Sequence, residues 1–253
     1  VVTPDIGSST LTVSPTGLFA TNVQDVKIRY NTVRNIGSAT NPARGIWMNL
    51  VQGLNNEMHN NAVSGVRSFS TATNSVNARG MEANLATTGT HTCYVYNNMI
   101  TDITGMFTGT NTALRLISGL LVGNSGGLAT QTYHVDHNSI SIDGSGALSA
   151  SSTCFDMAGS GITLNLRNNN LANWTGTQTG TPFHAVITTF TTASTIASST
   201  SEINYNNLYV ANPANGFVAR VNTTNHATIA AYDGGVTSPA SNDANSISVD
   251  PGF

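Results

Sequence analysis

The sequence predicts an all-β fold in which short strands stack in parallel along one axis. Three observations predict it: a motif that recurs about every 35 residues, apolar residues that alternate within each copy, and a composition poor in helix formers. The 253 residues include 31 Asn, 36 Thr and 25 Ser, and only 8% are charged. Because Lys, Arg and Glu are scarce, the composition argues against a helical bundle or a helical repeat.

The repeat is centred on one asparagine. In six segments, the residue three positions before this asparagine and the residue two positions after it are apolar. The six asparagines are Asn31, Asn61, Asn98, Asn138, Asn169 and Asn206, at intervals of 30, 37, 40, 31 and 37 residues. A seventh copy at residues 245–250 keeps an asparagine, Asn245, but lacks the upstream apolar residue. We interpret it as a degenerate last coil.

Each copy contains short strands. Apolar residues alternate with polar ones in segments such as 26–30 and 140–142, a period typical of strands with one buried face. A second element, Arg-Gly-Ile at residues 44–46, recurs as Arg-Gly-Met at 79–81. Gly-, Ser-, Thr- and Asn-rich loops of variable length separate these elements. We expect each repeat to wind one coil, giving about six to seven coils stacked about 4.8 Å apart.

The fixed position of the asparagine has a physical explanation. A coil of this kind needs a left-handed backbone residue at one turn, and asparagine tolerates that conformation best after glycine. Stacked asparagines also form hydrogen bonds from side chain to side chain along the axis. Ordinary turn asparagines, the alternative interpretation, would not recur between two apolar positions. The six asparagines are therefore predicted to form a column.

These motifs resemble those of right-handed parallel β-helix repeat proteins, in particular Asn-, Thr- and Ser-rich secreted and cell-surface proteins of Bacteroidota-type bacteria. The resemblance covers roughly residues 22–250 and rests on the Asn-Asn-x-Ile-like motif and the composition. Residues 245–253 are similar to the segment that often closes such helices. The resemblance implies a right-handed parallel β-helix and an extracellular location. It does not define an activity, because the family includes polysaccharide lyases, glycosidases, adhesins and phage tailspikes.

We expect residues 1–253 to form a single β-helix domain that is a fragment of a longer chain. The sequence begins Val-Val-Thr-Pro-Asp, without a start methionine, a basic segment or an apolar segment, so either a signal peptide was removed or the chain is a piece of a longer one. Open strand edges invite association, so both ends need covering. Residues 1–21 are candidates for an N-terminal cap or a preceding coil, and residues 232–253 for a degenerate last coil or a cap. Neighbouring domains of a longer chain are the alternative cover.

Composition and charge exclude several classes of protein. Nine Lys and Arg and a net charge of −3 leave too few cations for electrostatic binding of nucleic acid. No run of 18 apolar residues could span a membrane as a helix. Cys93 and Cys154 are expected to be separate buried thiols rather than a disulfide. The six histidines lack metal-ligand spacing, and we expect neither a metal nor a cofactor.

The densest polar group that could carry catalysis is Asp136-His137. Hydrolases need carboxylates that converge on one cleft, and lyases need a base, often with acidic Ca²⁺ ligands. Asp102, Asp143 and Asp156 could join the group from adjacent coils. We interpret Asp136 and His137 as strand neighbours on opposite faces, and the position of His137 as a solvated face. The sequence thus favours no catalytic residue, and Asp136, His137, Asp102 and Asp156 form the alternative set.

A row of arginines is the main candidate for binding an acidic glycan. Arg44 and Arg79 occupy equivalent positions, and Arg115 is expected to stack beside them. Pairing of these arginines with Glu82 or Glu57 is the favoured interpretation. The aromatic residues that could stack on a sugar, if exposed, are Trp47, Trp174, Tyr96 and Tyr205.

Trp174 shares an apolar position with residues 36, 66 and 103, so we expect it in the core. Taken together, these features predict a non-catalytic structural or adhesive segment of a secreted or cell-surface protein. The alternative is a carbohydrate-active enzyme, meaning a polysaccharide lyase or glycosidase, or a glycan-binding β-helix. Expected partners are glycans, other surface proteins and neighbouring domains of a longer chain.

Overall fold

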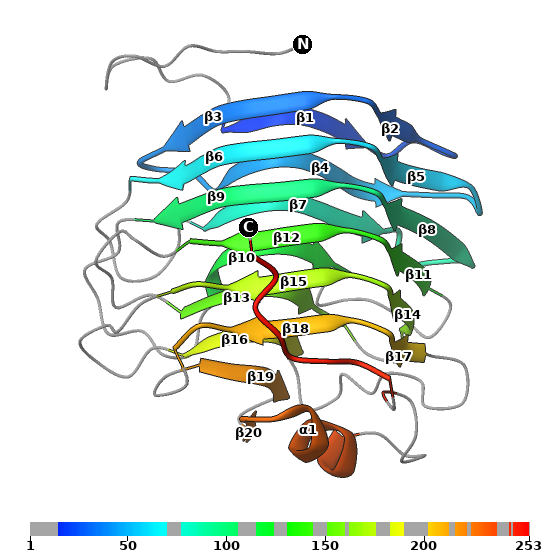
Figure 1. Ribbon diagram of the computed structural model, residues 1–253. Coiled ribbons are helices and arrows are strands. Elements are labelled where there is room, and N and C mark those ends of the chain that lie inside the picture. Colours follow the sequence, from blue (N-terminus) through cyan, green and yellow to red (C-terminus); the bar gives the residue numbers. More distant parts are fainter. Residues whose placement is uncertain are drawn as a thin grey trace.

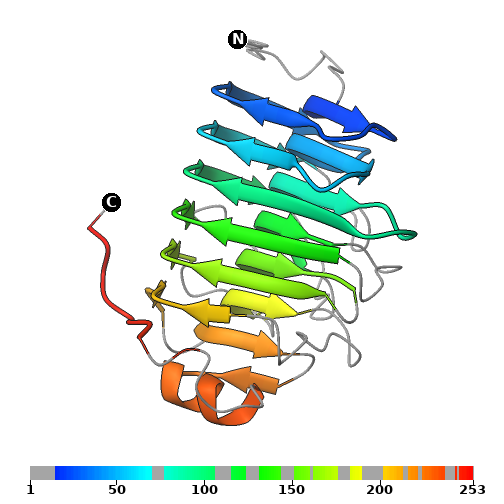
Figure 2. The ribbon, with the colours of Figure 1, turned by 90° about the vertical axis from the view of Figure 1, so that its right-hand side faces the viewer.

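The computed structural model describes residues 15–69, 77–105, 115–123, 131–143, 151–159, 162–175, 183–189, 202–212, 216–221, 224–236, 243 and 245–252. In these residues the chain is nearly all β, with one short helix, α1 (Ile229–Val236). The strands stack in layers along one axis, and the chain winds around that axis in a right-handed sense (Figures 1 and 2). The predicted right-handed parallel β-helix is therefore confirmed.

Three sheets form the walls of the helix. In Figure 1 the third sheet faces the viewer, the first lies behind it, and the second closes the right-hand side. The first sheet contains β1 (Thr16–Thr21), β4 (Ala43–Val51), β7 (Ala78–Leu85), β10 (Arg115–Val122), β13 (Ser151–Met157), β16 (His184–Thr189), β19 (Gly216–Val221) and, antiparallel at its end, β20 (Thr224–His226). The second sheet contains β2 (Lys27–Arg29), β5 (Asn56–His59), β8 (His91–Tyr96), β11 (Gln131–Asp136), β14 (Thr163–Arg167) and β17 (Glu202–Asn204). The third sheet contains β3 (Thr32–Ser38), β6 (Ala62–Ser68), β9 (Met99–Gly105), β12 (Ser139–Ile142), β15 (Asn170–Asn173) and β18 (Asn207–Val210).

Two apolar columns fill the corner between the second and third sheets. They are the two apolar positions of the repeat, and their members are register partners in neighbouring strands. The second sheet supplies Ile28, Met58, Val95, Val135, Leu166 and Ile203, and the third supplies Val33, Val63, Ile100, Ile140, Leu171 and Leu208. All are buried except Ile28, which is partly buried in the first described layer. Burial of these columns is the main apolar contribution to stability at this corner.

The six asparagines of the repeat form a continuous ladder at this corner. The backbone N–H and the side-chain Nδ2 of each asparagine donate to the Oδ1 of the next one, at 2.9–3.1 Å. From the second asparagine onward, Nδ2 also donates to a backbone carbonyl of the preceding layer, as from Asn98 to Met58 at 2.8 Å. Each interior asparagine therefore links the layers on both sides of it.

The left-handed residue of this turn is not the ladder asparagine, and that part of the prediction is wrong. It is the residue before the asparagine, with φ between 53° and 57° in all six layers. The six residues are Tyr30, Asn60, Asn97, His137, Asn168 and Tyr205. His137 is consequently a turn residue rather than a strand neighbour of Asp136, since β11 ends at Asp136.

The glycine of the recurring Arg-Gly-Ile and Arg-Gly-Met segments lies where two sheets approach each other closely. Gly45, Gly80 and Gly119 lie in one column of the first sheet, where the third sheet approaches closely. A Cβ at Gly80 would lie 2.4 Å from Cγ2 of Ile100 and 2.6 Å from the carbonyl oxygen of Gly119. The absence of a side chain therefore makes room for a branched side chain of the facing sheet.

The end of the chain joins the stack in a register one residue away from the sequence alignment. Ile247 pairs with Asn207, and Ser246 Oγ accepts the N–H of Asn206 at 2.9 Å. Ser246 therefore takes the ladder position predicted for Asn245. Because a shift of one residue exchanges the two faces of a strand, Ile247 and Val249 are exposed rather than buried.

The two ends of the stack differ within the described residues. At the C-terminal end, β20 and α1 lie below β19 in Figure 1. At the N-terminal end, residues 16–21 form β1, which pairs with β4 as the strands of other layers do. Of the predicted N-terminal cap or preceding coil, residues 1–14 lie outside the described residues. The described part thus belongs to a coil.

Replacing Gly80 with Ala tests the close approach of the sheets. The new Cβ would meet backbone as well as Ile100, so we expect a loss of about 3 kcal/mol in the free energy of unfolding. Urea unfolding followed by circular dichroism measures it. Gly37→Ala is the matched control, because its Cβ would meet only the movable ring of the exposed Phe69, and should cost less than about 1 kcal/mol. Equal losses would contradict the assignment.

Replacing Asn98 with Ala tests the ladder. It would leave the N–H and the Nδ2 group of Asn61 without their acceptor in a buried place, so we expect a loss of about 3–5 kcal/mol. Asn31→Ala is the control, because Asn31 is the first described rung and is half-buried, so water can replace its hydrogen bonds. It should cost about 1 kcal/mol. A ladder that does not stabilise the stack would give the two variants similar unfolding curves.

Candidate functional site

The carboxylates proposed for the alternative catalytic set lie on different walls of the helix. Asp136 ends β11 in the second sheet, Asp102 lies in β9 of the third, and Asp156 lies buried in β13 of the first. Asp143 follows β12. Because the three sheets face different directions, the structure does not bring these carboxylates into one groove (Figures 1 and 2).

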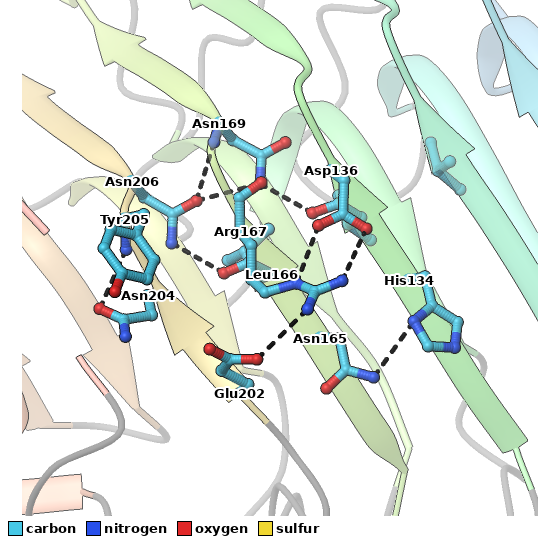
Figure 3. Close-up of polar contacts among 12 residues, drawn as sticks. His134, Asp136, Asn165, Leu166, Arg167, Asn169, Glu202, Asn204, Tyr205 and Asn206 are labelled. Carbon is cyan, nitrogen blue, oxygen red and sulfur yellow. Dashed lines mark hydrogen bonds and ion pairs between the residues drawn. The ribbon is translucent and has the colours of Figure 1, made fainter. Parts of the chain in front are cut away.

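Asp136 belongs to an ion-pair network on the outer face of the second sheet (Figure 3). Nε of Arg167 lies 3.0 Å from Oδ1 of Asp136, and Nη2 lies 3.4 Å from Oδ2. Nη1 of Arg167 donates to Oε2 of Glu202 at 3.3 Å. The hydrogen bond to Asp136 is the main reason that the pKa of Arg167 is raised, and the nearby charges of Asp136 and Glu202 add to it against partial burial. One guanidinium group thus connects three layers and engages both carboxylates.

His134 lies on the same face, one register step from Asp136 (Figure 3). Nδ2 of Asn165 donates to Nδ1 of His134 at 3.2 Å, and the imidazole stacks on Tyr94 with ring centroids 4.8 Å apart. Burial lowers the pKa of His134, and Arg167 acts in the same direction, whereas Asp136 opposes them. The imidazole is therefore neutral near pH 7, and its Nδ1 is already engaged in a hydrogen bond.

A second ring stack runs beside the first. His59 and Tyr96 are parallel, with centroids 4.6 Å apart and planes 4° from one another. Tyr30 approaches His59 at 77°, with centroids 5.5 Å apart. One face of the Tyr96 ring is thus covered by His59. This reduces the surface that Tyr96 offers for stacking on a sugar.

The predicted row of arginines exists for two of its three members. Arg44 and Arg79 are register partners in β4 and β7, and both bind Oε2 of Glu82, Arg79 through Nη1 at 2.7 Å. Burial alone would raise the pKa of Glu82, but Arg79 and Arg44 together outweigh it and lower the pKa. Arg115 does not continue the row, because Ser118 is the partner of Arg79. Loops of unequal length shift the register, so spacing in the sequence misplaced Arg115.

The two tryptophans do not offer free ring faces for stacking on a sugar, because both pack against other side chains. The guanidinium carbon of Arg44 lies 4.0 Å from the centroid of one Trp47 ring, and Phe19 stacks on Trp47 at 4.5 Å. Trp174, expected in the core, is only partly buried and packs against Tyr209 with centroids 5.0 Å apart. The reason is that β15 ends at Asn173, so Trp174 lies beyond the alternation that would direct it inward.

A buried polar network that the sequence did not predict lies between the first and third sheets. Ser152 Oγ lies 2.9 Å from Nδ1 of His184 and 2.9 Å from Oγ1 of Thr175. Nδ2 of Asn173 donates to Ser152 Oγ at 3.0 Å and to a backbone carbonyl. A serine hydroxyl hydrogen-bonded to a histidine is the arrangement of a nucleophile with its general base. Here, however, both side chains are buried and inaccessible to a substrate. The network instead satisfies the interior groups of Ser152, Thr175 and Asn173, whereas Nε2 of His184 is buried without a hydrogen-bond partner.

Both cysteines are free and buried, as the sequence predicts. Burial, with a smaller contribution from the charge of Glu57, raises the pKa of Cys93 to about 12. Burial also raises the pKa of Cys154. Neither thiol is therefore a thiolate near pH 7.

In the part of the chain that the structure describes, no group of three or more His, Cys, Asp or Glu side chains is arranged to hold a metal ion. The one helix in those residues is too short to cross a bilayer.

No protein-family model, no curated protein and no solved structure matches this chain. The structure alone therefore defines its class, a β-solenoid built from stacked parallel sheets. The likeness to surface proteins of Bacteroidota-type bacteria gains no support from these comparisons. Function has to be argued from the surfaces described above.

His184 predicts a dependence of stability on pH. Burial lowers the pKa of His184 from 6.5 to about 4, so between these values the unfolded chain binds a proton that the folded protein does not. Stability should therefore fall as the pH falls from 6.5 to 4, by up to about 3 kcal/mol. His184→Gln should flatten the pH dependence of the unfolding free energy. The exposed His137→Gln is the control, and a parental slope in His184→Gln would contradict the assignment.

Proposed function

We propose that this chain is a non-catalytic structural or adhesive segment of a secreted or cell-surface protein. The observation that carries the proposal is that charged side chains connect successive layers instead of converging on a cleft. Among the described residues, the ion pairs between layers are Lys27 with Glu57, Arg44 with Glu82, Arg67 with Asp102, Arg167 with Asp136, and Arg167 with Glu202. Every glutamate of the chain takes part in one of them.

This use of charge suits a rod-like spacer. Each layer adds about 4.8 Å along the axis, and the layers are joined by hydrogen bonds, apolar columns and ion pairs together. A surface dominated by Asn, Thr and Ser has little net charge and many hydrogen-bonding groups. Such a surface favours an extracellular role with glycans, other surface proteins or neighbouring domains of a longer chain as partners.

The alternative, a lyase or glycosidase that uses Asp136, has weaker support. A general base has to be free to accept a proton from the substrate, whereas Asp136 accepts two hydrogen bonds from Arg167. Glu202, the carboxylate nearest to it in the network, binds the same guanidinium group. Both carboxylates thus accept charge-assisted hydrogen bonds from one guanidinium group.

A depolymerisation assay tests the proposal. The protein is incubated with polygalacturonate, alginate, xylan and mixed-linkage β-glucan, and the size distribution and reducing ends of each polymer are measured. We expect no change for the parent or for Asp136→Asn, because the described residues bring no pair of free carboxylates together for acid–base chemistry. Cleavage by the parent would contradict a non-catalytic role, and its loss in Asp136→Asn would assign the activity to Asp136.

A further inference from the structure

The left-handed turn positions form an exposed line of side chains along the helix, which we name the turn ridge. It consists of Tyr30, Asn60, Asn97, His137, Asn168 and Tyr205. Left-handed backbone is unfavourable for bulky residues and acceptable for asparagine, which occupies half of these positions. Tyr30 and Tyr205 nevertheless have this conformation while remaining 72% and 56% exposed. Core packing does not account for tyrosine at these two positions.

A shallow groove of ≈ 430 Å³ lies against the N-terminal part of the turn ridge. It follows the corner where β2, β5 and β8 meet β3, β6 and β9, on the right-hand side of Figure 1. Its lining residues are Tyr30, Asn31, Thr32, Asn60, Asn61, Ala62, Asn97 and Met99. None of them is charged. The groove thus combines an exposed aromatic ring, the half-exposed side chain of Met99 and several amide and hydroxyl groups.

The groups of this groove repeat with the layers. Tyr30, Asn60 and Asn97 occupy one turn position in three successive layers, so they are spaced about 4.8 Å apart. This spacing is close to the length of one pyranose unit in an extended polysaccharide. The amide of Asn97 has no hydrogen-bond partner among the described side chains, whereas Nδ2 of Asn60 lies 3.1 Å from Nδ1 of His59. The Tyr30 ring contacts the His59 ring at 77° between the ring planes.

We propose that this groove binds a neutral oligosaccharide. The Tyr30 ring would stack on one sugar, because ring C–H groups of the sugar pack on aromatic faces, while Oδ1 of Asn60 and the amide of Asn97 would bond hydroxyl groups of the next units. The uncharged lining favours a neutral ligand over an acidic one, which would require a cation in the groove. The inference names the ligand class of an adhesive surface and so rests on the proposed function.

Binding is measured by isothermal titration calorimetry with cellohexaose, xylohexaose and mannohexaose, and with oligogalacturonate as the acidic probe. We expect saturable binding of at least one neutral probe and about a tenfold loss of affinity in Tyr30→Asn. Asparagine is favoured in the left-handed turn, so this variant should melt at or above the parental temperature. Loss of affinity with retained stability would show that the ring, not the fold, carries the binding.

Tyr205→Asn is the matched control, because Tyr205 has the same backbone conformation but does not line the groove. It should keep the parental affinity. The inference is overturned if no neutral probe binds, if Tyr30→Asn binds as the parent does, or if only oligogalacturonate binds. Chromatography of the probes after the titration separates the two proposals: shortened probes would overturn the non-catalytic role, and absent binding would overturn the ligand assignment alone.

Discussion

The architecture of this protein depends on the alignment of equivalent residues in successive layers along the helix axis. Each side chain lies one strand spacing from its equivalents in the layers above and below, and most polar contacts follow this direction. The asparagine ladder is the clearest case, since each of its first five asparagines donates both its backbone N–H and its side-chain Nδ2 to the next. The stacked rings of His59 with Tyr96 and of Tyr94 with His134 follow the same rule. Because identical contacts repeat, the stability of the stack is approximately a sum over neighbouring layers.

The same constraint governs what the surface can do. Side chains in one column meet their neighbours along the axis, so an isolated carboxylate tends to find a cation in the adjacent layer, as Asp136 finds Arg167. Catalytic constellations require groups from different elements to converge, and here Asp102, Asp136 and Asp156 project from separate walls. A columnar surface is better suited to an extended ligand whose own units repeat. The turn ridge has this property because its side chains are exposed in every layer except that of Asn60, which is half-buried.

Much of the candidate surface could be predicted from residue patterns, and the exceptions share a cause. Both apolar columns, the pairing of Arg44 and Arg79 with Glu82, and the buried thiols all follow from residue type and phase. The position of Arg115 and the register of Ser246 do not, because loops of unequal length separate the strands. The position of the turn-ridge tyrosines, one residue before a ladder asparagine, can be read from the sequence, but their left-handed φ cannot. The buried contact between Ser152 and His184 could not be predicted from the sequence, since only burial distinguishes these two residues from surface residues.

The periodic features of this protein follow from its amino-acid pattern. These are the all-β class, the repeat, and the identity of the residues that stack in the ladder and the core. Periodic features can be predicted from a sequence because the same local interaction recurs in every layer. The tertiary structure decided how far each strand extends, which residue of the turn is left-handed, and which polar groups lie inside. Those features depend on the path of the chain between layers and on the approach of one wall to another, as at Gly80. The spacing of a repeat along the sequence does not give the distance between facing sheets, because that distance depends on how the folded chain packs.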